Sequence, residues 1–333
     1  MATNQSRNLP FETIPGPQPR PGLAPWLALI GWIAIIASVA VPMVLLHMMG
    51  VGDSVDPFGP RLYGWYLVFA VILVVGFFGG VWLVALARRL RARPADTMLA
   101  EASRPLVLFL RSFDDDDLID PTPRMIPLGD FFPYRYEESL CAALEPVAPA
   151  VSIGRPGNKI AQLGGARLFV PDRAWRDAVG YLRRRAAVVV LVIGRTEGLW
   201  WEVETSMQQV PPERILFFFP FVEHAERRRN VWQRVFKFHP SRMPFSSRAF
   251  ARMEAERQAR YALFRERVQP FCSAPLPAAL GTSQFVDFKS DGTPRALPRV
   301  RPRTWWVYGL TPSTARMVID LPRTLKPFID KLT

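Results

Sequence analysis

Two apolar runs without a charged side chain constrain this chain more than any other feature of its sequence. The first lies between Arg20 and Asp53, and the second extends from Leu62 to Ala87. A helix over the second run would be about 39 Å long, which is enough to cross a hydrocarbon core of about 30 Å. The runs therefore predict a two-helix membrane hairpin over residues 23–90, preceded by an N-terminal segment.

The charges beside these runs predict how the hairpin is oriented. The second run is followed by four arginines, whereas the loop between the runs carries Asp53, Asp56 and a single Arg61. Positive residues stay on the cytoplasmic side of a membrane, so residues 1–22 and everything after the hairpin are expected in the cytoplasm. A signal peptide cleaved near Ala40 is the alternative, and it leaves the location of the C-terminal part unchanged.

Composition excludes several other classes of protein. With 49% hydrophobic residues the chain is too apolar for a disordered protein, and its two cysteines and three scattered histidines form no recognisable zinc pattern or disulfide framework. It contains neither a G-x-G-x-x-G nor a P-loop motif. The formal net charge of +13 comes mainly from arginine, as GC-rich coding DNA produces. Nucleic-acid binding is therefore not expected, and the arginines after the second run fit attraction to anionic lipid better.

Beyond a linker at residues 91–104, continuous apolar runs predict strands that are buried on both faces. These runs are residues 105–110, 149–153, 186–194 and 214–221. Strands of this kind are typical of a parallel sheet covered by helices. Residues 283–288 add a probable fifth strand.

Helical stripes alternate with these runs. They begin near Tyr136, Trp175 and Leu199, with Asp172 and Thr196 placed to cap the second and third helices. Regular alternation of strand and helix predicts an α/β domain over residues 105–333, with a flavodoxin-like parallel sheet and helices on both faces.

The C-terminal third departs from this alternation. A basic, aromatic stretch at residues 223–280 is interpreted as an insertion before the last strand that could lie on the membrane face. Asp291 and Gly292 form a turn signal. The final apolar stripe predicts a short closing helix that breaks at Pro322.

Candidate binding residues follow the strand ends, where open α/β sheets bind their ligands. We expect them in three loops. The first loop contributes Arg111, Ser112 and Asp114, the second Arg155 and Gly157, and the third Thr196, Trp200 and Trp201. Two of these loops have alternative interpretations. The acidic run that begins at Asp114 could hold a cation or be a solvated loop. The glycines around Arg155 could cradle a phosphate or simply reverse the chain.

Glu202 is the candidate catalytic residue. It lies near the start of the helix that follows the third apolar run, beside the two tryptophans. A carboxylate between aromatic rings at a strand end could stabilise a ribose or a developing cation. Alternatively, Glu202 favours a helix N-terminus through the helix dipole, and the tryptophans belong to the core.

Two stretches resemble Toll/interleukin-1 receptor (TIR) domains. LFLRSFDDDD is similar to their opening strand end, with Leu110, Ser112 and Phe113 matching, and VVVLVIGRTEGLWWE is similar to a later strand that leads to tryptophan and glutamate. In enzymatic TIR domains that glutamate cleaves the nicotinamide–ribose bond of NAD. The resemblance places this role on Glu202, with Ser112 lining the pocket and NAD or a related nucleotide as ligand or substrate. The overall layout also resembles a group of bacterial two-span membrane proteins, which implies the inner membrane.

Three functions follow from these observations. The first is a membrane-anchored cytoplasmic TIR-like signalling or interaction domain, which binds a nucleotide-like ligand or further copies of itself. The second is an N-glycosidase that acts on NAD or a nucleoside through Glu202. The third is a structural envelope protein whose basic residues 227–267 bind anionic lipid.

Overall fold

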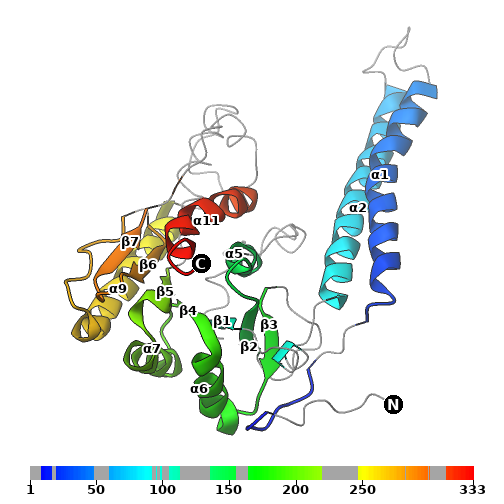
Figure 1. Ribbon diagram of the computed structural model, residues 1–333. Coiled ribbons are helices and arrows are strands. Elements are labelled where there is room, and N and C mark those ends of the chain that lie inside the picture. Colours follow the sequence, from blue (N-terminus) through cyan, green and yellow to red (C-terminus); the bar gives the residue numbers. More distant parts are fainter. Residues whose placement is uncertain are drawn as a thin grey trace.

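The computed structural model describes residues 9–16, 20–48, 60–91, 95, 98–99, 105–112, 136–154, 164–219, 247–281, 283–298, 300 and 313–333. Within these ranges the chain forms an α/β domain and a separate pair of long helices (Figure 1). The N-terminal pair and the domain are described in turn below.

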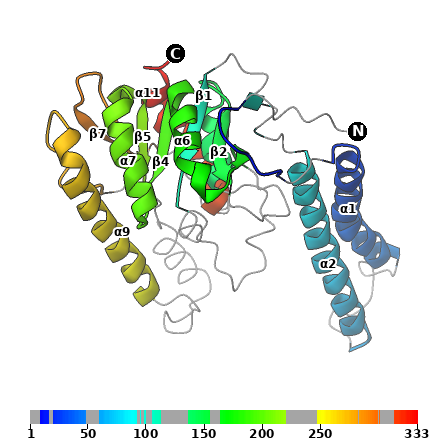
Figure 2. The ribbon, with the colours of Figure 1, turned by 90° about the horizontal axis from the view of Figure 1, so that it is seen from below.

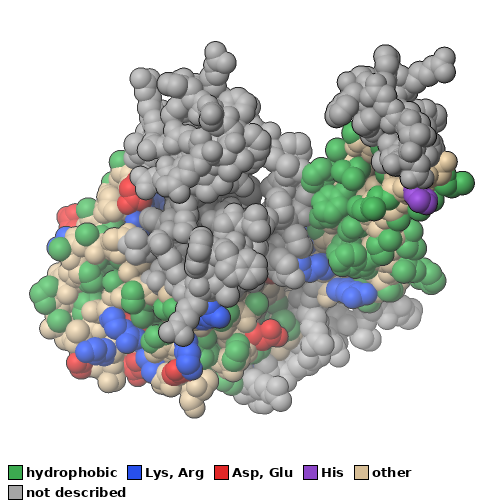
Figure 3. Space-filling view, turned by 90° about the horizontal axis from the view of Figure 1, so that it is seen from above, with side chains coloured by type: hydrophobic (Ala, Val, Ile, Leu, Met, Phe, Trp, Pro, Cys, Tyr) green, Lys and Arg blue, Asp and Glu red, His purple; other side chains and the backbone are tan. Residues whose placement is uncertain are grey.

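The two N-terminal helices form a hairpin. They are α1 (Ala24–Met48) and α2 (Pro60–Leu90), and each contains a segment long and apolar enough to cross a membrane. Large apolar side chains such as Trp26 and Leu67 remain exposed on them. Figure 3 shows hydrophobic side chains over the visible face of this hairpin, while charged side chains are scattered over the domain. A continuous apolar surface of this kind marks contact with a membrane or a partner.

Small residues hold α1 and α2 together. A Cβ atom added to Gly80 would lie 2.5 Å from the carbonyl oxygen of Gly31, and one added to Gly76 would lie 2.8 Å from the Cβ of Ser38. Nothing lies within 4 Å of such an atom on Gly79. The G-x-x-x-G spacing of Gly76 and Gly80 therefore lets the two backbones of one hairpin approach closely.

The domain is built on one sheet of seven strands in the order β3-β2-β1-β4-β5-β6-β7. The pairs from β3 to β5 are parallel, whereas β5–β6 and β6–β7 are antiparallel. The strands are β1 (Leu106–Leu110), β2 (Ala150–Gly154), β3 (Ala166–Phe169), β4 (Ala186–Val192), β5 (Ile215–Phe218), β6 (Phe285–Phe288) and β7 (Pro294–Leu297).

The four apolar runs predicted as strands are confirmed as β1, β2, β4 and β5. The predicted fifth strand is β6, but the prediction of a wholly parallel sheet was wrong at this end. The reason is local, because Asp291 and Gly292 turn β6 directly into β7. Gly292 takes a φ of +78°, and the Asp291 carboxylate accepts a hydrogen bond from the Thr293 amide at 2.8 Å. A tight turn of this kind can join only antiparallel strands.

Five helices accompany these strands in the described parts of the domain. They are α5 (Tyr136–Leu144), α6 (Trp175–Arg185), α7 (Glu197–Gln209), α9 (Ser247–Val268) and α11 (Ser313–Ile329). Short 3₁₀ turns cover Asp172–Ala174, Pro212–Arg214 and Gln269–Phe271.

Two predictions about helix ends were wrong. Asp172 does not cap α6, because it opens a 3₁₀ turn and Ala174 occupies the capping position. The last helix does not break at Pro322, since α11 continues to Ile329. Buried Leu325 and Phe328 anchor its final turns against the domain, and this packing offsets the main-chain hydrogen bond that proline removes.

Alternate strand residues enter two separate hydrophobic clusters. On β1, for example, Leu108 belongs to one cluster and Phe109 to the other. The first cluster includes side chains of α6, α7 and α9, and the second includes side chains of α5 and α11. Figures 1 and 2 show where these helices lie in the domain. Tyr261 and Phe264 of α9 are buried in the first cluster. Part of the predicted 223–280 insertion is therefore an integral part of the core.

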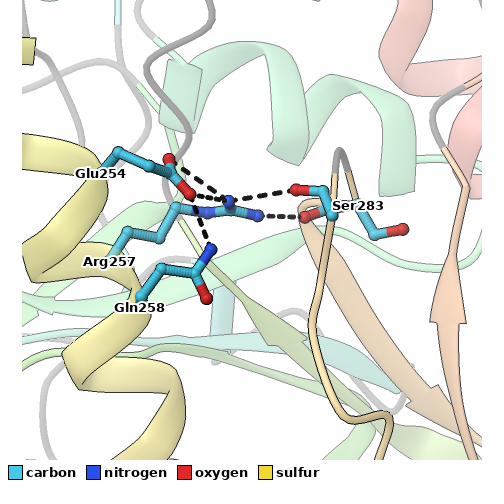
Figure 4. Close-up of polar contacts among 5 residues, drawn as sticks. Glu254, Arg257, Gln258 and Ser283 are labelled. Carbon is cyan, nitrogen blue, oxygen red and sulfur yellow. Dashed lines mark hydrogen bonds and ion pairs between the residues drawn. The ribbon is translucent and has the colours of Figure 1, made fainter. Parts of the chain in front are cut away.

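One buried arginine fastens α9 to the start of β6 (Figure 4). The guanidinium of Arg257 donates hydrogen bonds to the carboxylate of Glu254 at 3.1 Å and to the main-chain carbonyls of Gly281 and Ser283 at 3.2 and 2.6 Å. Burial lowers the pKa of Arg257 from its usual value. A charged group accepts this environment because three acceptors surround it.

The chain preceding α1 lies against the domain that follows α2. Residues 9–16, which we term the N-terminal strap, run beside β3 and α6 (Figure 2). The Ile14 amide donates a hydrogen bond to the carbonyl of Phe169 at 2.8 Å, and the Arg20 amide donates one to the carbonyl of Leu90 at 3.0 Å. Both outer ends of the hairpin are therefore attached to the same body.

Candidate functional site

The strand order changes direction beside β1. From β1 the chain moves outward to β2 and β3, and it then returns to place β4 on the other side of β1. Arg111 and Ser112 follow β1 directly, while Thr196 lies just beyond the end of β4. Parallel strands end at the same edge, so the structure places these predicted residues at the switch point where such sheets bind ligands.

A buried ion cluster occupies the β1–β3 part of this edge. The guanidinium of Arg167, on β3, donates hydrogen bonds from one nitrogen to both carboxylate oxygens of Glu137, at 2.9 and 3.0 Å. The Nε of Arg111 lies 3.6 Å from the same carboxylate. All three side chains are at most 6% exposed. Glu137 therefore links the end of β1, the first turn of α5 and β3.

Glycine allows the carboxylate to sit at this position. Gly164, just before β3, has a φ of +126°, and a Cβ atom there would lie 2.7 Å from an oxygen of Glu137. Any other residue would both strain the backbone and displace the carboxylate.

The neighbouring Glu138 connects this edge to the helical hairpin. Its carboxylate pairs with the guanidinium of Arg88 in the last turn of α2. Glu137 and Glu138 are consecutive in the first turn of α5, so one helix turn contacts both the ion cluster and the end of α2. Ser112 is also buried at this edge.

Glu202 lies in a different environment. Its side chain is buried in the seam between α6 and α7, where the Trp175 indole N–H donates a hydrogen bond to its carboxyl group. Burial raises the pKa of Glu202 to about 8, and the Trp175 hydrogen bond and the charge of Arg183 counteract this only in part. Glu202 therefore holds a proton at neutral pH.

The two tryptophans beside Glu202 are packing residues. Trp200 is 1% exposed within the first core cluster, and the guanidinium of Arg267 lies 5.0 Å from the centre of its ring. Trp201 packs against the ring of Trp175 at 5.1 Å. Both rings therefore have packing partners within the domain.

Thr196 caps α7, as its position in the sequence predicts. Its side-chain oxygen accepts a hydrogen bond from the Leu199 amide at 3.4 Å, and its backbone is extended. This cap sets where α7 begins and therefore which residues of the helix face α6.

The structure divides the predicted site residues into separate groups. Arg111 contacts Glu137 on α5, whereas Glu202 contacts Trp175 on α6, and these two helices pack in different core clusters. The predicted residues Asp114, Arg155 and Gly157 lie outside the described residues. So do residues 227–246, the part of the basic 227–267 segment that precedes α9.

Two residues of the ion cluster were not anticipated from the sequence. Glu137 looks like an ordinary acidic residue at a helix N-terminus, and Arg167 looks like part of a loop. One signal was present, because Arg167 interrupts the apolar run ARLFV, and a charged residue inside a buried strand needs a partner.

Metal and thiol chemistry find no support in the described ranges. No group of three or more histidine, cysteine, aspartate or glutamate side chains there could hold a metal ion. Burial raises the pKa of the Cys141 thiol far above its usual value, so this thiol is not a reactive nucleophile.

Comparison with known proteins gives no family assignment. No protein-family model, curated protein or solved structure matches the chain. Its function therefore has to be inferred from the geometry of its own residues.

Proposed function

We propose that the chain is a membrane-anchored interaction or signalling module at the cytoplasmic face of a bacterial inner membrane. In this proposal the domain is a TIR-like, flavodoxin-type sheet with helices on both faces. The observation that carries it is the double attachment of hairpin and domain, through Arg88–Glu138 at the end of α2 and through the strap before α1. A change in the packing of α1 against α2 then reaches the domain at two points.

The same attachment supports the proposed topology. Residues before α1 and residues after α2 contact one another, and this contact supports a topology with both outer ends of the hairpin on one side of the bilayer. Arg88, Arg89 and Arg91 at the end of α2 favour the cytoplasm as that side. A reporter fused after Thr333 should be active in the cytoplasm, and periplasmic activity would contradict the proposal.

The chemistry at the strand ends favours interaction over catalysis. Arg111 and Arg167 are bound to Glu137, and the carboxyl group of Glu202 is enclosed between α6 and α7. Both carboxyl groups therefore have structural partners. We infer that the edge of the sheet presents a fixed surface to a nucleotide-like ligand or to another copy of the chain.

Full chain reconstituted in lipid vesicles provides the test. Self-association is measured by energy transfer between labelled copies, at several protein-to-lipid ratios, with and without a panel of nucleotides. We expect association that rises with surface density or with one of the nucleotides. A chain that remains monomeric at every density, with every nucleotide, would remove the basis of the proposal.

One observation favours the N-glycosidase as a second candidate. A carboxyl group with a pKa of about 8 at the ligand-binding end of a sheet is typical of catalytic acids. The candidate predicts that the reconstituted chain consumes NAD or a nucleoside and that Glu202→Gln stops this consumption. Glu204→Gln, two residues along the same helix, is the matched control and should retain it. An inactive wild-type chain, including at high surface density, would exclude this candidate.

A further inference from the structure

A row of polar groups runs along the seam between α6 and α7, which lie side by side (Figures 1 and 2). On α7 the row consists of Glu202, Ser206 and Gln209, which are four and three residues apart and therefore share one side of the helix. From α6 the Trp175 indole donates a hydrogen bond to the Glu202 carboxyl group. The Arg183 guanidinium donates one to the side-chain oxygen of Gln209 at 2.6 Å. Each end of the row therefore attaches α6 to α7 through a different hydrogen bond.

Two hydrogen-bond donors in this row are unused. The Nη1 group of Arg183 and the hydroxyl of Ser206 are buried and have no hydrogen-bond partner among the described residues. Ser206 lies one turn from Glu202 on α7, and the charge of Arg183 acts on the Glu202 carboxyl group. Buried donors are nearly always satisfied, so two unused donors beside one acid require an explanation. They are the groups that an ionised carboxylate would need in place of water.

Arg183 is the only buried charged residue facing Glu202 from the described parts of the neighbouring helices. The other charged residues of α6 and α7, and the α9 residue that contacts them, all reach the surface. They are Arg176, Asp177, Arg184 and Arg185 on α6, Glu197 and Glu204 on α7, and Arg267 on α9, which pairs with both of these glutamates. β4, between the two helices in sequence, carries no charged residue. The ionisation of Glu202 is therefore governed by its burial and by Arg183.

We propose that the α6–α7 seam is a proton-operated switch in which Arg183 changes its partner from Gln209 to Glu202. While Glu202 holds its proton, Arg183 binds Gln209 and closes the end of the seam, as in the structure. When the proton passes to water, the carboxylate attracts the guanidinium and accepts hydrogen bonds from Arg183 and Ser206. Gln209 is exposed and can then bond to water instead. The last turn of α7 is released from α6, while the Trp175 bond keeps the other end attached.

The direction of the switch follows from the burial of Glu202. Burial raises the pKa of this carboxyl group to about 8, so the Arg183–Gln209 arrangement predominates below about pH 8 and the Arg183–Glu202 arrangement above it. The two arrangements compete for the same guanidinium. Any change that frees Arg183 from Gln209 therefore favours the ionised acid and lowers the pH of the transition. This switch goes beyond the proposed function, because it needs neither a ligand nor a second copy.

Hydrogen exchange of the last turn of α7 tests the switch in the full chain, from about pH 6 to about pH 9, with each rate corrected for the intrinsic pH dependence of exchange. In the wild type the protection of this turn should fall at least about tenfold, because a hydrogen bond to a charged group is lost. Protection of α5, which packs in the other core cluster, should not change. Glu202→Gln should keep the turn protected throughout, and Glu204→Gln is the matched control that should follow the wild type.

Gln209→Ala separates a change of partner from a general loosening. Without its acceptor Arg183 is available to Glu202, so the ionisation midpoint of Glu202 should fall by about one pH unit. The midpoint is followed by the carboxyl infrared absorption that Glu202→Gln lacks. Gln208→Ala, at the neighbouring exposed position, is the matched control and should leave the midpoint in place. Equal midpoints in these two variants would overturn the inference, and so would a loss of protection that extends to α5 or is absent from α7.

Discussion

Two buried glutamates stand near the same edge of the sheet and are accommodated in opposite ways. Glu137 and Glu202 are each 4% exposed. Glu137 lies between the guanidinium groups of Arg167 and Arg111, whereas the Glu202 carboxyl accepts one hydrogen bond from the Trp175 indole. The guanidinium of Arg183, whose charge acts on Glu202, donates a hydrogen bond to Gln209 at 2.6 Å.

The difference shows how a fold can bury an acid. An ionised carboxylate leaves water only when opposite charges and donors replace its hydration, and the Glu137 cluster supplies them. Where they are weak, the group keeps its proton, which is why burial raises the pKa of Glu202 to about 8. The ion cluster of Glu137 joins β1, β3 and α5. The protonated Glu202 makes the stability of the α6–α7 seam depend on pH.

The largest effect is expected from Glu137→Ala. Removing this carboxylate deprives two buried guanidinium groups of the charge between them, which typically costs about 3–5 kcal/mol of unfolding free energy. Urea unfolding of the full chain in detergent, followed by pulse proteolysis of the domain, measures the loss. Glu145→Ala, at an exposed position just after α5, is the matched control and should change stability by less than about 0.5 kcal/mol. Equal stabilities would mean that the cluster does not hold this edge together.

Glu202→Gln should have the next largest effect, on the pH dependence of stability. The folded pKa of about 8 exceeds the ordinary value of 4.5, so the unfolded chain loses this proton first as the pH rises. The stabilisation is therefore complete below about pH 4.5 and lost by about pH 8, with a slope of at most about 1.4 kcal/mol per pH unit. Glutamine keeps an acceptor for Trp175 without the charge.

Unfolding free energies measured between pH 5 and 8 check this expectation. The wild-type chain should lose more stability than Glu202→Gln across that range, and Glu204→Gln, which leaves the buried proton site intact, should follow the wild type. Parallel curves for wild type and Glu202→Gln would show that the seam does not hold a proton.

Thr196→Ala should produce the smallest effect. It removes the N-cap of α7, which contributes about 1 kcal/mol, and the 3.4 Å bond to Leu199 suggests no more than that. Thr205→Ala, on the same helix, is the control, and its effect on stability should have the opposite sign or be absent. The Thr205 hydroxyl donates to the Trp201 carbonyl, an interaction that slightly disfavours helix, so its loss should be neutral or stabilising. Hydrogen exchange of the amides in the first turn of α7 distinguishes the effect of Thr196→Ala from that of Thr205→Ala.

Sequence patterns were sufficient where a local property decided the structure. Long apolar runs predict the two long apolar helices and the strands β1, β2, β4 and β5, and Thr196 predicts the start of α7. They failed for β3 and β7, which include Arg167 and Pro294. A charged residue or a proline interrupts the apolar pattern, and such strands are stabilised mainly by their neighbours.

The candidate site was predictable only as a set of positions. Arg111, Ser112 and Thr196 lie at the expected edge because alternation of strand and helix predicts parallel strands, whose carboxyl ends meet at one edge. Glu202 points into the seam between α6 and α7 because of how these two helices pack. No sequence pattern within either helix specifies this packing.

The sequence by itself determined that this chain has two long apolar helices and a largely parallel sheet, because both depend on runs of neighbouring residues that avoid water. Only the tertiary structure decided which charges meet. Glu137 and Arg167 are joined across the sheet, and the N-terminal strap reaches the β3 edge past the whole hairpin. Such contacts depend on where folding places distant segments, since electrostatic and hydrogen-bonding energies require the partners to be within a few ångströms.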